Sequence, residues 1–368
     1  MTDFTLPLRE DLIGESPYGA PHDHVPARLN VNENPFAPSQ HLINDLAAAI
    51  SEAAESLNRY PDRDAVALRH ALATYISNES FMSLDIDRIW PGNGSNEVMA
   101  HIFSAFGGPG RAVLTFPPTY SMYPEYARNS FTEMINVPRN QDFEIETDSA
   151  CDALRVNRPT LAVIAAPNNP TGTSISMASL SAIVECAQSV GALVVVDEAY
   201  AEFRSDPQNT AVRLLNEYPN LIVTRTLSKA FGFAGGRVGY CLTSSPAIVQ
   251  ALMLVRLPYH LSALTQVAAI TALQHDSDMR DQIDLLRSER FRVADSLASL
   301  GLVVAPSDAN FLFFGTFHNR HSVWRSLLDR GVLIRETGPD HWLRVSIGTP
   351  SENNLFIESM SEIMSEQR

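Results

Sequence analysis

Short apolar runs alternate with amphipathic stretches between about residues 89 and 254. The runs are too short for independent helices and are rich in β-branched residues, so they predict strands buried on both faces. Such strands are typical of a parallel sheet that is covered by helices, which places the chain in the α/β class. The clearest runs are Ala112–Leu114, Leu161–Ile164, Leu193–Val196 and Leu221–Val223.

The stretches between these runs supply the covering helices. From Met177 to Val190, apolar side chains recur at helical spacing, and Gly191 follows as a residue suited to a helix C-terminus. The apolar positions are Leu180, Ile183, Val184 and Ala187. The pattern therefore predicts a helix over residues 177–190.

The pattern changes after Pro258. A long charged helical pattern covers Asp278–Leu300, and short strands follow it with helices between them, an order that suggests an α+β domain. These strands are expected around Val303, Phe311–Phe314, Val332–Ile334 and Leu343–Ile347. The first forty-odd residues are proline-rich and irregular, which predicts an arm that lies across another surface.

The length of the chain agrees with this division. At 368 residues it exceeds the size at which one hydrophobic core stops growing, so a large domain and a smaller one are expected. We predict an N-terminal arm over 1–45, a large domain over 46–257 and a small domain over 258–368.

Charge, cysteines and termini narrow the class of protein further. The formal net charge of −15 opposes nonspecific binding to nucleic acid or to anionic membranes. Cys151, Cys186 and Cys241 are widely spaced with no Cys-x-x-Cys pair, so we expect neither a disulfide framework nor a zinc site. The sequence has no run of eighteen apolar residues and no signal-peptide pattern at its start, so a soluble, cytoplasmic protein is expected.

Polar segments follow three of the predicted strands in succession. They are Asn168–Gly172, Asp197–Tyr200 and Thr226–Lys229, and Arg237 lies eight residues beyond the lysine. Each segment alone is better explained as a turn, a helix cap or surface residues. Together they supply an amine for an imine, an acid for a pyridine nitrogen, donors for a phenolic oxygen, and a cation with hydroxyls for a phosphate.

Over essentially all of its length, the chain resembles the fold-type-I pyridoxal-phosphate-dependent aminotransferases, and among them the histidinol-phosphate aminotransferase family. The segments that carry the resemblance are Asn32–Pro35, Asn58–Pro61, Gly94–Glu97, Pro118–Tyr120, Asn168–Gly172, Asp197–Tyr200, Ser228–Phe231, Gly235–Arg237 and Leu343–Arg344. The resemblance implies a large domain with a mixed, mostly parallel sheet and a smaller α+β domain. It also implies an arm that packs with the small domain and with a partner subunit.

The resemblance implies roles for the residues around the cofactor ring. Lys229 binds pyridoxal 5′-phosphate through an imine and moves the proton during catalysis. Asp197 binds the pyridine nitrogen, Tyr200 and Asn169 bind the phenolic oxygen, and Tyr120 stacks on the ring. Lys229, Asp197 and Tyr200 are thus the expected catalytic residues.

The resemblance also implies a cup for the cofactor phosphate and a homodimer. The start of a helix at Ser95 favours an anion through its backbone N–H groups and its dipole. In the family, a tyrosine equivalent to Tyr60 reaches the phosphate from the neighbouring subunit, which implies shared active sites. The expected cofactor-phosphate residues are Ser95, Asn96, Thr226, Ser228, Arg237 and Tyr60.

The implied reaction moves an amino group between L-histidinol phosphate and 2-oxoglutarate or glutamate, in histidine biosynthesis. Arg344, with Arg335, is expected to bind the substrate phosphate and also to serve glutamate, because the guanidinium fork suits either anion. Tyr18 is expected to reach the partner's substrate pocket, and Asn34 and Asn169 are expected to contact the substrate.

Two features depart from the common family pattern, and other functions stay open. Asn96 stands where an acidic residue is frequent, and Gly235–Gly236 precedes Arg237 where a bulkier residue often occurs. An aromatic amino-acid aminotransferase or a threonine-phosphate decarboxylase shares the same cofactor residues. A noncatalytic regulatory relative is disfavoured, because Lys229 is present and no basic helix-turn-helix segment is appended.

A metal site is not expected. The segment His22–His24 has the chemistry of metal ligands, but no further ligand stands at a telling distance along the chain. We interpret these histidines as solvated side chains of the arm.

Overall fold

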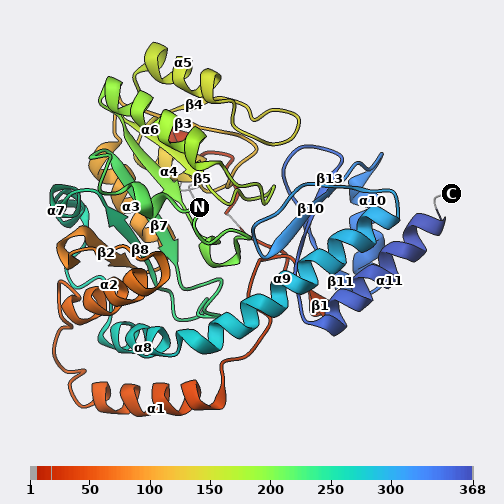
Figure 1. Cartoon of the computed structure of the whole chain (residues 1–368), viewed down its shortest axis with the longest axis horizontal. Coiled ribbons are helices and arrows are strands. Elements are labelled where there is room, and N and C mark those ends of the chain that lie inside the picture. The colour runs from red at the N-terminus through yellow and green to blue at the C-terminus, as the bar shows by residue number, and fades with distance from the viewer. Residues whose placement is uncertain (1–5, 18, 367–368) are drawn as a thin grey trace, which may run out of the picture.

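The computed structural model describes residues 6–17 and 19–366. Figure 1 shows a larger lobe that contains residues from the first two thirds of the chain and a smaller lobe built from the last third. The long helix α9 (Asp276–Ser299) runs from the base of the larger lobe to the smaller one. Within the described residues, no helix is both long and apolar enough to cross a membrane.

A seven-stranded sheet forms the centre of the larger lobe. Its order is β2-β8-β7-β6-β5-β3-β4, and β8 is antiparallel to both of its neighbours while the other pairs are parallel. The strands are β2 (Ile89–Gly92), β8 (Gly239–Thr243), β7 (Leu221–Thr226), β6 (Leu193–Asp197), β5 (Leu161–Ala165), β3 (Ala112–Thr115) and β4 (Glu133–Asn136). The predicted α/β fold with a mixed, mostly parallel sheet is therefore confirmed.

The central strands are buried on both faces, as their apolar runs predicted. On β6, Val194 and Val196 belong to one hydrophobic cluster, whereas Val195 belongs to a second cluster on the other face. Helix α6 spans Met177–Val190 and ends at Gly191, as predicted. The other helices around this sheet are α2 (Val66–Ser80), α3 (Ser95–Phe106), α4 (Tyr123–Asn129), α5 (Thr147–Asn157) and α7 (Pro246–Val255). Short 3₁₀ turns occur at Glu10–Leu12, Ile86–Arg88, Ala201–Phe203 and Ala211–Leu214.

An antiparallel sheet of order β12-β13-β10-β9 forms the smaller lobe. Its strands are β9 (Val303–Val304), β10 (Phe311–Gly315), β12 (Arg335–Glu336) and β13 (Trp342–Ser346), and α10 (Arg320–Asp329) and α11 (Pro350–Glu366) complete the lobe. Strand β1 (Ala27–Arg28) pairs in parallel with β11 (Val332–Leu333), so the N-terminal segment is anchored on this lobe.

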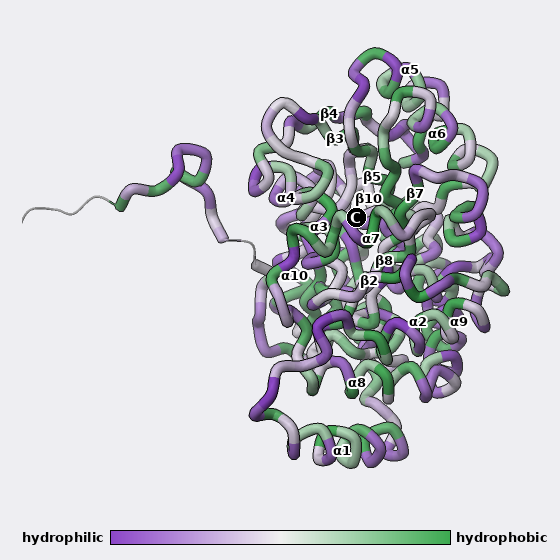
Figure 2. The backbone as a smooth tube through the Cα atoms, turned by 90° about the vertical axis from the view of Figure 1, so that its left-hand side faces the viewer, coloured by the Kyte–Doolittle hydropathy of each residue, from purple (hydrophilic) through white to green (hydrophobic). Residues whose placement is uncertain are grey.

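Two helices lie apart from both sheets. Helix α1 (Gln40–Ala54) packs along α8 (Ala263–Gln274), and α8 also packs against α2. Figures 1 and 2 show α1 at the lower edge of the molecule with α8 beside it. Although α8 follows residue 258, it belongs with the helices of the larger lobe. The domain limits 1–45, 46–257 and 258–368 stay predictions.

Cys151 and Cys186 are joined by a disulfide, which corrects the expectation of none. Cys151 lies on α5 and Cys186 on α6, and these two helices pack side by side. The bond links residues 35 positions apart, so the spacing along the chain did not reveal it. Cys241 is a buried free thiol on β8.

Candidate active site

A cavity of about 180 Å³ lies where β5, β6 and β7 end, with residues of the N-terminal segment and the small sheet closing it. Ligands commonly bind at the carboxyl ends of parallel strands in open α/β sheets. The predicted site residues that line this cavity are Ser95, Asn96, Tyr120, Asn169, Asp197, Tyr200, Thr226, Ser228, Lys229, Arg237, Arg335 and Arg344.

Lys229 follows β7 and extends into this cavity. Its Nζ atom donates a hydrogen bond to the Val31 carbonyl oxygen at 3.1 Å. Burial, and after it the positive charge of Arg344, lower the pKa of Lys229 to about 8. An amine with a depressed pKa is more often uncharged and therefore nucleophilic near neutral pH.

Asp197 is the last residue of β6, and two buried hydroxyls hold its carboxylate. Tyr123 donates to Oδ2 at 2.9 Å and Thr224 donates to Oδ1 at 3.2 Å. Burial raises the pKa of Asp197, while these two hydrogen bonds oppose that effect because they favour the ionised form. Tyr123 is not among the predicted site residues, because it lies 74 positions from Asp197 along the chain and no local pattern indicates this contact.

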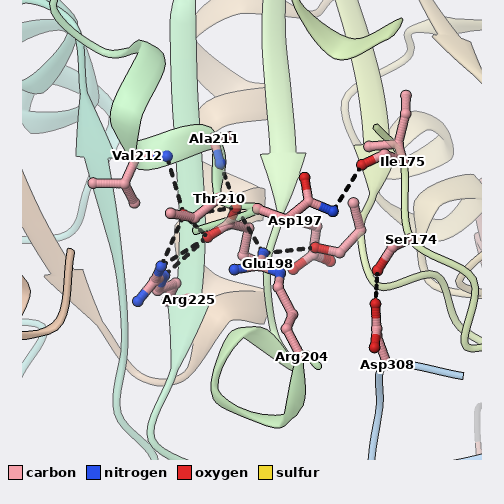
Figure 3. Close-up of polar contacts among 12 residues, drawn as sticks. Ser174, Ile175, Asp197, Glu198, Arg204, Thr210, Ala211, Val212, Arg225 and Asp308 are labelled. Atoms are coloured by element: carbon pink, nitrogen blue, oxygen red, sulfur yellow. Dashed lines mark hydrogen bonds and ion pairs between the residues drawn. The ribbon is translucent and has the colours of Figure 1, made fainter. Parts of the chain in front are cut away.

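A buried ion network fixes the backbone beside Asp197 (Figure 3). The carboxylate of Glu198 contacts Arg204 at 2.7 Å and Arg225 at 2.9 Å, and it accepts hydrogen bonds from Thr210 and the Ala211 N–H. These three charged side chains are at most 2% exposed. Because Glu198 follows β6 and Arg225 lies on β7, the network ties together the two strand ends that carry Asp197 and Lys229.

The Tyr200 hydroxyl lies between two asparagines. It accepts a hydrogen bond from Asn32 Nδ2 at 3.0 Å and has Asn169 Nδ2 at 3.4 Å. Asn32 comes from the N-terminal segment and is 2% exposed, so that segment completes the wall of the cavity. The sequence analysis did not select Asn32, although it stands in the quoted segment Asn32–Pro35.

The first turn of α3 forms a cradle with the loop after β7. Two glycines make the close approach possible: Gly94 has φ +81°, and a Cβ there would lie 2.5 Å from Arg237 Nη2. A Cβ at Gly239 would lie 2.1 Å from the Ser95 nitrogen. Ser228 Oγ lies 3.4 Å from Arg237 Nη1 and 3.1 Å from the Thr226 hydroxyl. Backbone N–H groups, hydroxyls and a guanidinium thus converge, as phosphate binding requires.

The two departures from the family pattern have structural accounts. Asn96 Oδ1 accepts a hydrogen bond from the Tyr126 hydroxyl at 2.9 Å, and the Tyr120 hydroxyl lies 3.5 Å from the same oxygen. An uncharged amide therefore replaces an acid beside the cradle. At Gly236, a Cβ would lie 2.0 Å from the Phe233 ring, so a bulkier residue would displace that ring.

Two arginines face the cavity from the smaller lobe. Arg335 on β12 and Arg344 on β13 are direct partners across the antiparallel pair. Arg344 donates to Asn169 Oδ1 at 2.6 Å and to the Asn30 carbonyl at 2.8 Å, and it is 7% exposed. Arg335 donates to the Gly19 carbonyl at 3.3 Å. Both guanidinium groups line the same cavity.

Two predicted site residues, Asn34 and Tyr60, do not line the cavity, and a third cannot be placed relative to it. Asn34 bonds to the Ala230 carbonyl and to Gln282 at 2.8 Å, which turns its amide away from the site. The Tyr60 side chain is 80% exposed and stacks on Tyr259 with ring centroids 4.4 Å apart. Tyr18 lies outside the described residues.

These features match those of known proteins. The family model for aminotransferase class I and II matches residues 26–360. The chain belongs to this family, and it is a pyridoxal-phosphate-dependent aminotransferase.

The similar proteins point to one group within this family. The chain is 52% identical to histidinol-phosphate aminotransferase 3 of Burkholderia lata over 359 residues, which cover 98% of this chain and 96% of the relative. It is 50% identical to the histidinol-phosphate aminotransferase of Thermobifida fusca over 355 residues, covering 96% and 95%. The structure of histidinol-phosphate aminotransferase from Sinorhizobium meliloti in complex with pyridoxal-5′-phosphate superposes with a TM-score of 0.85, at 25% identity and 99% coverage of both chains. The resemblance and the cofactor predicted from the sequence are confirmed.

The residues present fit the cofactor. A buried carboxylate, a partly buried lysine with a lowered pKa, and a cradle of N–H groups, hydroxyls and a guanidinium line one cavity. This donor set matches an aldehyde, a ring nitrogen and a phosphate carried by one molecule.

Proposed function

We propose that this enzyme transfers an amino group between L-histidinol phosphate and 2-oxoglutarate or glutamate, as a step of histidine biosynthesis. The observation that carries the substrate assignment is the pairing of Arg335 with Arg344 at one cavity wall. Like charges directly opposite each other on adjacent strands destabilise a sheet, and a bound anion relieves that repulsion. The phosphate of histidinol phosphate is such an anion, and the names of the curated relatives support the same substrate.

Arg344 also serves the second half-reaction in this proposal. Its contacts to Asn169 and to the Asn30 carbonyl hold the guanidinium in one orientation, so its fork is prepared for a bidentate anion. Glutamate presents a carboxylate where histidinol phosphate has none. One guanidinium can therefore bind the carboxylate of one substrate and the phosphate of the other.

Bound pyridoxal phosphate supplies an electron sink for the substrate carbon that loses its proton. We infer that Ser95, Asn96, Thr226, Ser228 and Arg237 hold the cofactor phosphate. The ring is held by Asp197 at its nitrogen, by Tyr200 and Asn169 at its phenolic oxygen, and by Tyr120 at its face.

The chain's own groups then move and hold the protons. Lys229 Nζ is the proposed base, because its lowered pKa leaves part of the amine uncharged near neutral pH. The carboxylate of Asp197 keeps a proton on the ring nitrogen through a charge-assisted hydrogen bond. Tyr123 and Thr224 orient that carboxylate and support its negative charge.

We also propose a homodimer in which Tyr60 binds the cofactor phosphate of the partner subunit. Its exposed ring stacks on Tyr259. Two leucines that shortly precede Tyr259 in the sequence are also exposed: Leu254 is 86% exposed and Leu257 is 77% exposed. Gathered exposed apolar side chains commonly mark a protein interface. Tyr18 and Asn34 stay predictions for the substrate pocket, and Asn34 would need to turn from its present partners.

A cytoplasmic location remains a prediction from the sequence. A histidine-biosynthetic role agrees with it. The disulfide between Cys151 and Cys186 weighs against it, because such bonds are rare in reducing compartments.

Substitution of the paired arginines tests the substrate assignment. Arg335→Ala and Arg344→Ala should each raise the KM for histidinol phosphate by about thirtyfold or more, since losing a buried charge-assisted contact costs about 2–5 kcal/mol. The KM for unphosphorylated histidinol should change little. The matched control is Arg325→Ala, which removes an exposed arginine of α10 and should change neither value.

The rate of the glutamate half-reaction distinguishes the roles of the two arginines. Arg344→Ala should impair the glutamate half-reaction severely, whereas Arg335→Ala should be milder. Small and equal effects on histidinol phosphate and histidinol would contradict the proposal and favour an aromatic aminotransferase.

A further inference from the structure

Three side chains with metal-ligand chemistry, none of which lines the active-site cavity, meet at another place in the fold. His41 and Asp45 lie one turn apart on α1, and His275 stands at the junction of α8 and α9. Their nearest nitrogen and oxygen atoms all lie within 4.8 Å of one another. Asp45 Oδ2 is 2.8 Å from His275 Nε2 and 3.8 Å from His41 Nε2.

The two separations to Asp45 lie near the value that a small divalent ion requires, whereas the separation of the two imidazoles is bounded only at 4.8 Å. Zinc binds imidazole nitrogen and carboxylate oxygen at about 2.0–2.2 Å in a tetrahedron, which sets neighbouring ligand atoms about 3.3 Å apart. The two measured separations lie on either side of that value. His41 and Asp45 are 78% and 48% exposed, so their side chains can turn to adjust both separations, and water can fill an open position.

His275 has polar neighbours that would orient its imidazole as a metal ligand. Its Nδ1 atom lies 3.9 Å from Asp278 Oδ2, and Asp278 in turn accepts a hydrogen bond from the Ser39 hydroxyl. A carboxylate near the second imidazole nitrogen favours the tautomer that leaves Nε2 available to a metal. Ser39 also caps α1 by accepting from the Leu42 N–H at 3.1 Å, so these polar neighbours join the same two elements as the ligands.

The site lies where α1 meets the α8–α9 corner. Leu42 is the one buried residue among those of α1, and the helix packs along α8 at the edge of the molecule (Figures 1 and 2). An ion bound by His41, Asp45 and His275 would add a cross-link between α1 and the α8–α9 corner.

We propose that His41, Asp45 and His275 form a binding site for a divalent transition-metal ion of the zinc type, which fastens α1 to the α8–α9 corner. The ligands come from segments 230 residues apart. Their spacing along the chain therefore resembled no metal motif, and no metal was expected from the sequence.

Zinc titration of the holoenzyme tests the site. The protein is freed of metal and of unbound cofactor, and Zn²⁺ binding is measured by calorimetry in a buffer without phosphate. We expect one saturable Zn²⁺ per chain. His41→Gln, Asp45→Asn and His275→Gln should each weaken binding by more than about tenfold, because loss of even an outer-shell group costs 10–100-fold.

Two controls keep the result specific. His70→Gln removes an exposed histidine of α2 that lies outside the cluster, and it should leave the affinity unchanged. His24→Gln tests whether a histidine of the N-terminal arm, which also has the chemistry of a metal ligand, binds the ion instead. His41→Gln is the decisive variant, because its exposed side chain can be replaced without disturbing the core.

Thermal unfolding gives a second readout. Zn²⁺ should raise the unfolding midpoint of the wild type in a concentration-dependent way and should leave that of His41→Gln unchanged, since a ligand that binds only the folded state stabilises it. The proposal is overturned by the absence of saturable binding. It is equally overturned if His41→Gln binds Zn²⁺ as the wild type does, or if His24→Gln abolishes binding.

Discussion

Lys229 sits among charges and apolar atoms that set how readily its amine reacts. Its pKa is lowered to about 8 by burial and by the neighbouring guanidinium of Arg344. Below that pH the amine is mostly protonated and cannot attack an aldehyde, and above it the uncharged form dominates.

Covalent capture of the cofactor should therefore depend on pH. With cofactor-free protein, the rate at which pyridoxal phosphate becomes covalently attached should rise as the pH increases through about 8. Arg344→Ala should move this rise to higher pH, because a positive charge that lowers the pKa of Lys229 is removed. The rates are followed by absorbance across the pH range. An identical profile for both proteins would show that Arg344 does not act on the lysine.

Asp197 and Tyr123 should act as a coupled pair. Asp197→Asn should retain bound cofactor but lose most of the chemical rate, because an amide cannot stabilise the protonated ring nitrogen. Tyr123→Phe should slow single-turnover transamination by about tenfold or more, the cost of a hydrogen bond to a charged group. In the Asp197→Asn background, Tyr123→Phe should have a much smaller effect. An unchanged rate in Asp197→Asn would leave the residue as a structural cap.

At the residue scale, the sequence identified the reacting groups better than the residues that hydrogen-bond to those groups. Lys229, Asp197 and Arg237 stand in short motifs whose chemistry is recognisable along the chain. Tyr123 and Asn32 act through contacts with residues 74 and 168 positions away, and no local pattern distinguishes them from core or turn residues. Asn32 and Asn34 stand in one segment, and only the fold shows that Asn32 lines the cavity.

Strands and helices could be predicted where the spacing of apolar residues along the chain is regular. The strands of the large sheet and helix α6 are buried on defined faces, so their hydrophobic patterns give their positions. The sequence showed no sign of the contacts that α8 makes with α1 and α2, because the residues involved lie far apart along the chain. The contact between α5 and α6 was hidden for the same reason, and the Cys151–Cys186 disulfide with it.

The disulfide should contribute measurably to stability. A cross-link that closes a loop of this length restricts the unfolded chain and adds about 3–4 kcal/mol in the chain-entropy model. Reduction should lower the free energy of unfolding of the wild type by that order, as measured in urea. Reduction of Cys186→Ser should have no further effect. Alkylation of three cysteines in unfolded, unreduced enzyme would show that the bond is absent.

The whole molecule joins two lobes around one cavity, and that arrangement brings the arginines of the small sheet to the lysine of the large one. The net charge of −15 repels phosphate at long range, so local cations must bind the cofactor and the substrate. How subunits assemble is a property of this scale that the sequence indicated only through family resemblance.

Subunit mixing tests whether Tyr60 acts across an interface. Tyr60→Phe should weaken cofactor retention, and Lys229→Ala should abolish multiple turnover. If Tyr60 serves the partner's site, a heterodimer of the two variants has one intact site and regains activity, measured after tagged heterodimers are purified. If Tyr60 serves its own subunit, every site in that heterodimer is impaired. An enzyme that is monomeric and fully active at all dilutions would contradict the shared site.

The most direct test of the central claim is a single-turnover reaction of the purified holoenzyme with each amino donor. Histidinol phosphate, histidinol, phenylalanine and glutamate are mixed separately with excess enzyme, and loss of the absorbance of the lysine-bound cofactor is followed. The account predicts fast conversion by histidinol phosphate and glutamate and slow conversion by histidinol, because histidinol lacks the anion that the other two present to Arg335 and Arg344. Phenylalanine reacting as fast as histidinol phosphate, or histidinol reacting as fast as its phosphate ester, would contradict it.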